Sequence, residues 1–94
     1  MLFYINESYT PELCTRQAEF NRRQMNKLDS EIADLRKVLK AIPSWESPAP
    51  EDYELVCALI NKIEYLSDHA DNYERQVDYW LTQKRYALLR EVNN

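Results

Sequence analysis

The sequence predicts an all-α protein in which two long antiparallel helices form a coiled-coil-like helical hairpin. Two observations predict this fold class. Apolar residues recur at alternating intervals of three and four along most of the chain, which is the spacing of a coiled-coil seam. Three prolines lie within residues 43–50 and divide this pattern into two parts. Residues 1–94 are therefore expected to form a single helical-hairpin domain.

The first helix is predicted over residues 10–42, after an N-terminal extension of residues 1–9. Thr10 supplies an N-cap hydroxyl, and Pro11 suits the first helical position, where a backbone N–H has no intrahelical partner. Pro43 ends the helix because proline cannot continue the hydrogen-bond ladder. The predicted seam of this helix comprises Cys14, Ala18, Asn21, Met25, Leu28, Ile32, Leu35, Leu39 and Ile42.

The second helix is predicted over residues 51–92, after a stiff proline-rich turn at residues 43–50. Acidic residues in its first turn suit the positive end of the helix dipole. If the chain folds back at the turn, the two seams match along their length, with Ile32 opposite Leu66. The predicted seam of the second helix comprises Val56, Leu59, Ile63, Leu66, Ala70, Tyr73, Val77 and Trp80.

The apolar pattern of the second helix changes after Trp80. Lys84 and Ala87 take the next seam positions, while Leu81, Leu88 and Val92 lie to one side, as in a drifting 11-residue pattern. A hairpin has only one internal seam, whose burial barely offsets the entropy of ordering the chain. We therefore expect a homodimer or higher homo-oligomer, in a four-helix arrangement. The residues expected to form its interface are Leu2, Phe3, Ile5, Leu81, Leu88 and Leu89.

The composition excludes several functional classes. The chain contains no glycine, which argues against P-loops, Rossmann turns and nucleophile elbows, because these need backbone freedom that only glycine provides. A net charge of −4 argues against direct nucleic-acid binding or attraction to anionic membranes. The chain has no apolar run of about 18 residues and no basic region before its short apolar N-terminus, so we expect a cytoplasmic protein.

No catalytic residue, metal ligand or cofactor is predicted, and the chain is not expected to be an enzyme. The sole histidine, His69, lies in the middle of a helix without a nearby nucleophile. Leu66 stands three residues before it, where a di-iron bundle would need glutamate. Cys14 and Cys57 lack ligand-like neighbours, so both are expected to be reduced packing residues.

A second stripe of residues, polar and aromatic, runs along the second helix beside the seam. Tyrosines offer rigid contact area with a hydrogen-bonding tip, and amides offer adaptable donors and acceptors, which is a composition favoured in protein-binding surfaces. We interpret this tyrosine–amide row as a partner-binding surface, with packing against a dimer mate as the alternative. Its members, spaced alternately by four and three, are Tyr65, His69, Asn72, Gln76, Tyr79, Gln83 and Tyr86.

These observations predict a non-catalytic protein-binding module, a small helical inhibitor, anti-repressor or adaptor that grips another protein. One alternative is a structural coiled-coil protein that only self-assembles. The other is an acidic mimic that blocks a nucleic-acid-binding protein, although charge lines are more often solvated helix faces. The acidic line that suggests this mimic consists of Glu64, Asp68, Asp71 and Asp78.

Overall fold

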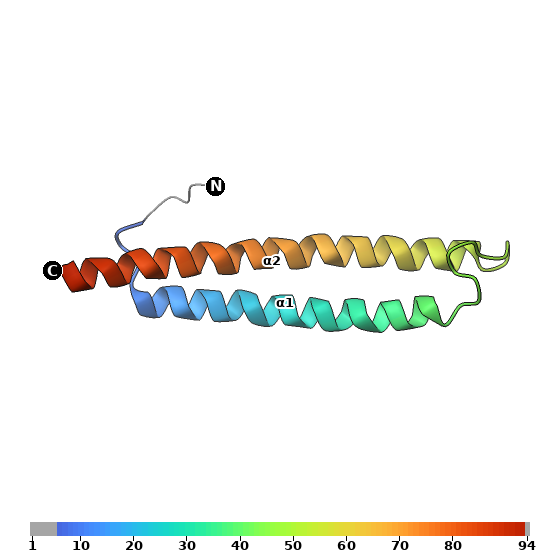
Figure 1. The fold of residues 1–94 in the computed structure, drawn as a ribbon, viewed down its shortest axis with the longest axis horizontal. Coiled ribbons are helices and arrows are strands. Elements are labelled where there is room, and N and C mark those ends of the chain that lie inside the picture. Colours follow the sequence, from blue (N-terminus) through green and yellow to red (C-terminus); the bar gives the residue numbers. More distant parts are fainter. Residues whose placement is uncertain (1–5, 94) are drawn as a thin grey trace.

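The protein folds as a two-helix hairpin (Figure 1). The computed structural model describes residues 6–93. Helix α1 spans Pro11–Lys40 and helix α2 spans Tyr53–Asn93. The two helices lie side by side and antiparallel, and the molecule measures 67 × 21 × 14 Å along its principal axes. The predicted all-α hairpin is confirmed.

Helix α1 begins as its sequence predicts. Thr10 has extended backbone angles, and its Oγ1 accepts a hydrogen bond from the Leu13 N–H at 3.1 Å, which satisfies one of the unpaired donors of the first turn. The helix ends at Lys40, two residues before the predicted end. The reason is local, because Ile42 precedes Pro43 and a residue in that position is disfavoured in the helical conformation.

The connection between the helices is a series of tight turns. The Ser47 N–H donates to the Ser44 carbonyl, and the Asp52 N–H donates to the Ala49 carbonyl, both at 2.9 Å. Ser44 has φ of 54°, in the left-handed region that glycine adopts most easily. Since the chain contains no glycine, a serine occupies this position. Helix α2 starts at Tyr53, two residues after the predicted start.

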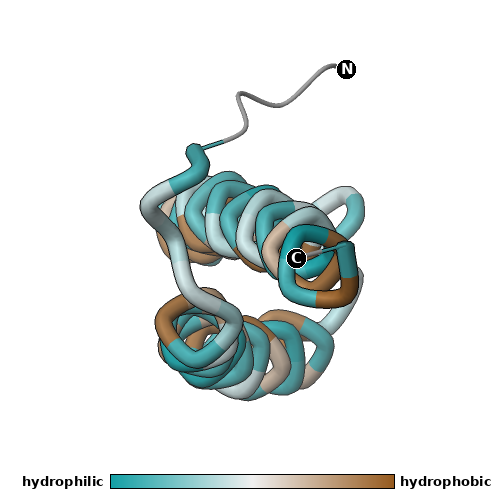
Figure 2. The backbone as a smooth tube through the Cα atoms, turned by 90° about the vertical axis from the view of Figure 1, so that its left-hand side faces the viewer, coloured by the Kyte–Doolittle hydropathy of each residue, from teal (hydrophilic) through white to brown (hydrophobic). Residues whose placement is uncertain are grey.

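The hydrophobic core follows the predicted seams. Ile32, Leu66 and Ala70 are buried together at its centre, which agrees with the expected pairing of Ile32 with Leu66. Seen along the hairpin, hydrophobic and hydrophilic segments alternate in both helices (Figure 2). Half-buried residues of both seams pack around this centre, namely Met25, Leu28, Leu35 and Ile63.

The N-terminal part of α1 continues the seam as expected, since Cys14, Ala18 and Asn21 are all buried. Asn21 lies on the seam, and its side-chain amide donates to the Gln17 carbonyl of its own helix at 2.7 Å. This hydrogen bond satisfies a polar donor that burial would otherwise penalise.

The seam of α2 shifts by one residue near its C-terminal end. Gln83 is only 2% exposed, whereas Lys84, the predicted seam residue, is half-buried. Ala87, the next predicted seam residue, is 2% exposed as expected. The regular alternation of spacings is interrupted here, because Val77, Trp80, Gln83 and Ala87 are separated by three, three and four residues. Inserting a three-residue step into a coiled coil produces the same pattern. The shift turns Gln83 inward, and Leu81, Leu88 and Val92 are exposed, as expected for residues beside the seam.

The residues that precede α1 are docked on the C-terminal part of α2. The Asn6 N–H donates to Gln83 Oε1 at 3.1 Å, and an Arg90 guanidinium nitrogen donates to the Tyr9 carbonyl at 3.0 Å. The Tyr9 and Trp80 rings pack with their centroids 4.9 Å apart. Three residues of the expected interface, Leu2, Phe3 and Ile5, lie outside the described residues.

Candidate functional site

The tyrosine–amide row of α2 divides into an exposed part, from Tyr65 to Gln76, and a part from Tyr79 to Tyr86 in which the chain itself covers Tyr79 and Gln83. Tyr65, His69, Asn72 and Gln76 are all exposed, and Tyr65 retains 58% of its accessible surface. Tyr79 is half-buried, Gln83 is buried and Tyr86 is 40% exposed. The continuous surface available to another protein therefore extends from Tyr65 to Gln76.

Neighbouring side chains order the exposed part of the row. The Tyr65 and His69 rings meet edge to face, with centroids 4.5 Å apart. The Lys62 ammonium lies 5.6 Å from the centroid of the Tyr65 ring, within the range of a cation–π contact. Arg75 donates a hydrogen bond to the Asn72 side-chain oxygen. These contacts restrict the side chains of Tyr65, His69 and Asn72.

Two residues of the other part, Tyr79 and Gln83, pack within the chain. The Tyr79 and Trp80 rings are 5.1 Å apart in an edge-to-face arrangement, and Trp80 in turn packs against Tyr9. Gln83 accepts a hydrogen bond from the Asn6 backbone. The structure thus places Tyr79 and Gln83, both predicted as partner-binding residues, in intramolecular packing.

Leu81, Leu88 and Leu89, the described residues of the expected dimer interface, lie together in a shallow groove of about 470 Å³. Their side chains are 41%, 44% and 50% exposed. Residues two positions apart point to nearly opposite sides of an α-helix, so Leu81 lies across the helix from Gln83. The other residues that line this C-terminal groove are Lys84, Arg85 and Val92.

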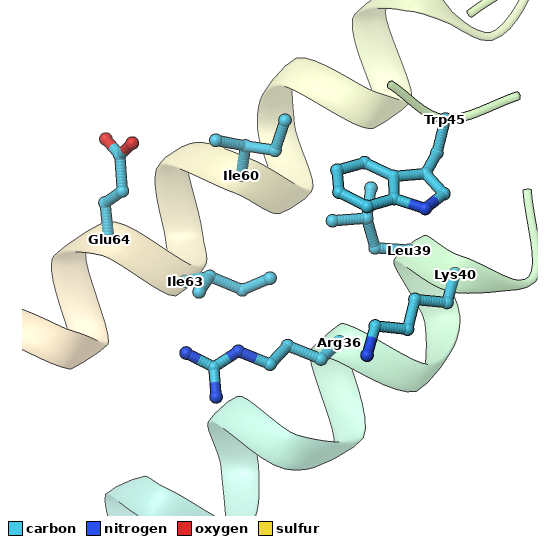
Figure 3. A pocket seen from close by; sticks show the side chains of 7 residues that line it. All are labelled: Arg36, Leu39, Lys40, Trp45, Ile60, Ile63 and Glu64. Carbon is cyan, nitrogen blue, oxygen red and sulfur yellow. The ribbon is translucent and has the colours of Figure 1, made fainter. Parts of the chain in front are cut away.

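A pocket of about 420 Å³ lies at the turn end of the hairpin (Figure 3). The half-buried Trp45 indole lies beside Leu39, and Ile60 and Ile63 of α2 face them. The residue spacing did not predict this pocket. The one signal in the sequence was an aromatic residue, Trp45, within the proline-rich turn. The charged residues that line it are Arg36, Lys40 and Glu64.

Comparison with known proteins found no matching family model, curated protein or solved structure. The function must therefore be inferred from the chemistry and placement of these surfaces.

The acidic line is interrupted by a cation from the other helix. Glu64 and Asp71 each line a shallow hollow that Arg36 of α1 also lines. Asp68 and Asp78 are exposed. A cation that lines the same hollows as two of the four acids makes this surface less uniformly negative than a phosphate mimic requires.

The two cysteines are free thiols in different surroundings. Burial raises the pKa of Cys14 above its ordinary value of 9.0, and this effect outweighs the opposing attraction of Arg90 and Lys84. Cys57 is half-buried, and its hydrogen bond with Tyr53 raises the pKa of the tyrosine. A buried thiol whose protonated form is favoured is a poor nucleophile.

Residues 6–93 contain no group of three or more histidine, cysteine or acidic side chains that could hold a metal ion. In the same part of the chain, neither helix combines the length and apolarity needed to cross a membrane.

Proposed function

We propose that this chain is a non-catalytic protein-binding module, an inhibitor, anti-repressor or adaptor that holds another protein against α2. The observation that carries the proposal is the exposed part of the tyrosine–amide row, where Tyr65, His69, Asn72 and Gln76 lie side by side on one helix. Tyrosine and amide side chains are typical of interfaces that combine an apolar contact with adaptable hydrogen bonding.

The arrangement of this surface supports binding to a folded partner. Tyr65 supplies a large side chain that is already held by His69 and Lys62, as expected of an anchor residue that loses little freedom on binding. Because α1 packs against the seam of α2, which lies beside the row, the row has a rigid support.

Affinity capture from the native cell extract, followed by mass spectrometry, tests the proposal. The baits are the wild-type chain, a Tyr65→Ala, Gln76→Ala double variant, and Tyr53→Ala as the matched control. Tyr53 is an equally exposed tyrosine of α2, at 60% against 58% for Tyr65, but it lies outside the row. We expect one stoichiometric partner with the wild type and the control, and a loss of roughly tenfold or more with the double variant.

Circular dichroism of the three baits checks that helicity is unchanged. Undiminished capture by a folded double variant would remove the row from the proposal. Recovery of only the chain itself from every bait would instead favour the second candidate, a structural protein that self-assembles. The specific observation behind that candidate is the C-terminal groove, where three leucines remain exposed.

A further inference from the structure

One side of α2 carries a regular stripe that no other part of the described chain covers. Its members are spaced alternately by four and three, so they share one side of the helix. All of them are exposed, and Figure 1 shows that the C-terminal end of α2 extends beyond the start of α1. This C-terminal stripe consists of Glu74, Asp78, Leu81, Arg85, Leu88 and Val92.

The charges of the C-terminal stripe change sign at Leu81. Glu74 and Asp78 precede the leucine, and Arg85 follows it, with Lys84 beside it in the same groove. Within the described residues these four side chains form no ion pair or hydrogen bond with one another or with other side chains. Leu81, with unpaired acids before it and unpaired bases after it, is complementary in charge to a reversed copy of itself.

The order of the charges selects the orientation of that copy. In a parallel pair of α2 helices, Asp78 would lie level with Asp78 and Arg85 level with Arg85, so like charges would repel. In an antiparallel pair centred on Leu81, Asp78 lies level with Lys84 of the second copy and one residue from Arg85. The two-fold axis repeats this attraction on the other side of Leu81.

The described N-terminal segment does not compete for this side of α2. It is held on Gln83 and Trp80, and Gln83 lies across the helix from Leu81. We propose that the chain forms an antiparallel homodimer in which the C-terminal stripes of two copies pack together, with Asp78 of each copy paired to Lys84 and Arg85 of the other.

This inference rests on the self-assembly candidate, for which it supplies the surface, the orientation and the charge pairs. It is independent of partner binding, because the exposed part of the tyrosine–amide row lies outside the stripe. Loss of the Tyr65 and Gln76 side chains is therefore expected to leave the dimer unchanged.

A charge-exchange experiment with the full chain tests the proposal, and sedimentation equilibrium provides the mass. The wild type is expected at twice the 11.3 kDa mass of one chain. Asp78→Lys alone, and Lys84→Glu with Arg85→Glu together, each place like charges across the interface. Each is expected to raise the dimer dissociation constant roughly tenfold or more. An equimolar mixture of the two variants restores every attraction and is expected to return to the mass of a dimer.

Asp68→Lys is the control, because it reverses an exposed acid of α2 that lies outside the stripe; its dimer is expected to persist. Circular dichroism verifies that each variant remains helical. A wild type of single-chain mass at all concentrations overturns both the inference and self-assembly. A wild-type dimer that both reversals leave intact overturns this surface alone, and a mixture that stays monomeric overturns the antiparallel pairing.

Discussion

Burial separates the two cysteines in their reactivity. Cys14 has no exposed surface and lies on the seam between the helices, so a reagent reaches its sulfur only after local opening. Cys57 is half-buried on α2. We expect a thiol reagent to modify Cys57 at least about tenfold faster than Cys14, measured on the Cys14→Ala and Cys57→Ser single-cysteine variants. Equal rates would show that the seam is open at Cys14.

The raised pKa of Cys14 also predicts a dependence of stability on pH. Because burial favours the protonated thiol, the folded state retains its proton at pH values where the unfolded chain has lost it. The contribution of Cys14 to the free energy of unfolding is therefore complete below its ordinary pKa of 9.0. It is lost as pH rises from there through the raised pKa of the folded state. Urea unfolding of the wild type and Cys14→Ala across this range measures it, as a decline in the free energy of unfolding that is steeper in the wild type than in the variant.

The burial of polar residues is the part of the structure that spacing predicts least well. Asn21 falls on the regular seam, and its burial was predicted. Gln83 is buried because the seam shifts after Trp80 and because its side chain receives the Asn6 N–H from 77 residues away. No local pattern contains that contact, so the spacing alone assigned Gln83 to the exposed row.

At the scale of the elements, the helices and the position of their connection follow from the sequence, whereas the conformation of the connection does not. The 3-4 spacing fixes which side of each helix is buried, and Pro43 stops α1 by known backbone chemistry. The turn pocket was not predicted, because Trp45 lies in an irregular segment whose side chains follow no period. The dimer interface and the partner-binding role of the row remain predictions.

In the turn, Ser44 has a left-handed backbone conformation, which affects stability. Such a conformation costs a residue with a β-carbon about 1–2 kcal/mol, whereas the extra freedom of glycine in the unfolded chain costs about 0.5–1 kcal/mol. Ser44→Gly is therefore expected to raise the free energy of unfolding by about 0.5–1 kcal/mol in urea denaturation. Ser47→Gly is the matched control, since Ser47 has no positive φ, and we expect it to be neutral or destabilising. Stabilisation by both variants would remove the backbone explanation.

At the scale of the whole molecule, the hairpin is long and thin. Its cross-section of 21 × 14 Å holds two helices of about 10–12 Å diameter, so most side chains lie close to water and the two ends share few interactions. Each end has its own tryptophan, Trp45 at the turn and Trp80 beside the docked N-terminal segment.

These two tryptophans report separately on the two ends. Tyr9→Ala removes the ring that covers Trp80, so we expect a red shift of Trp80 emission in a Trp45→Phe background, because the indole becomes more exposed to water. The same substitution in a Trp80→Phe background is expected to leave Trp45 emission unchanged. A shift at both tryptophans would mean that the ends are coupled through the hairpin.

The contacts of the N-terminal segment also bear on the order in which the chain folds. They join Asn6 to Gln83 and Tyr9 to Arg90, across separations of 77 and 81 residues, whereas the seam next to the turn closes only a short loop. Closing a long loop is entropically costly until intervening contacts have shortened it. We therefore expect folding to proceed as a zipper from the proline-rich turn, with the N-terminal segment docking last and detaching first.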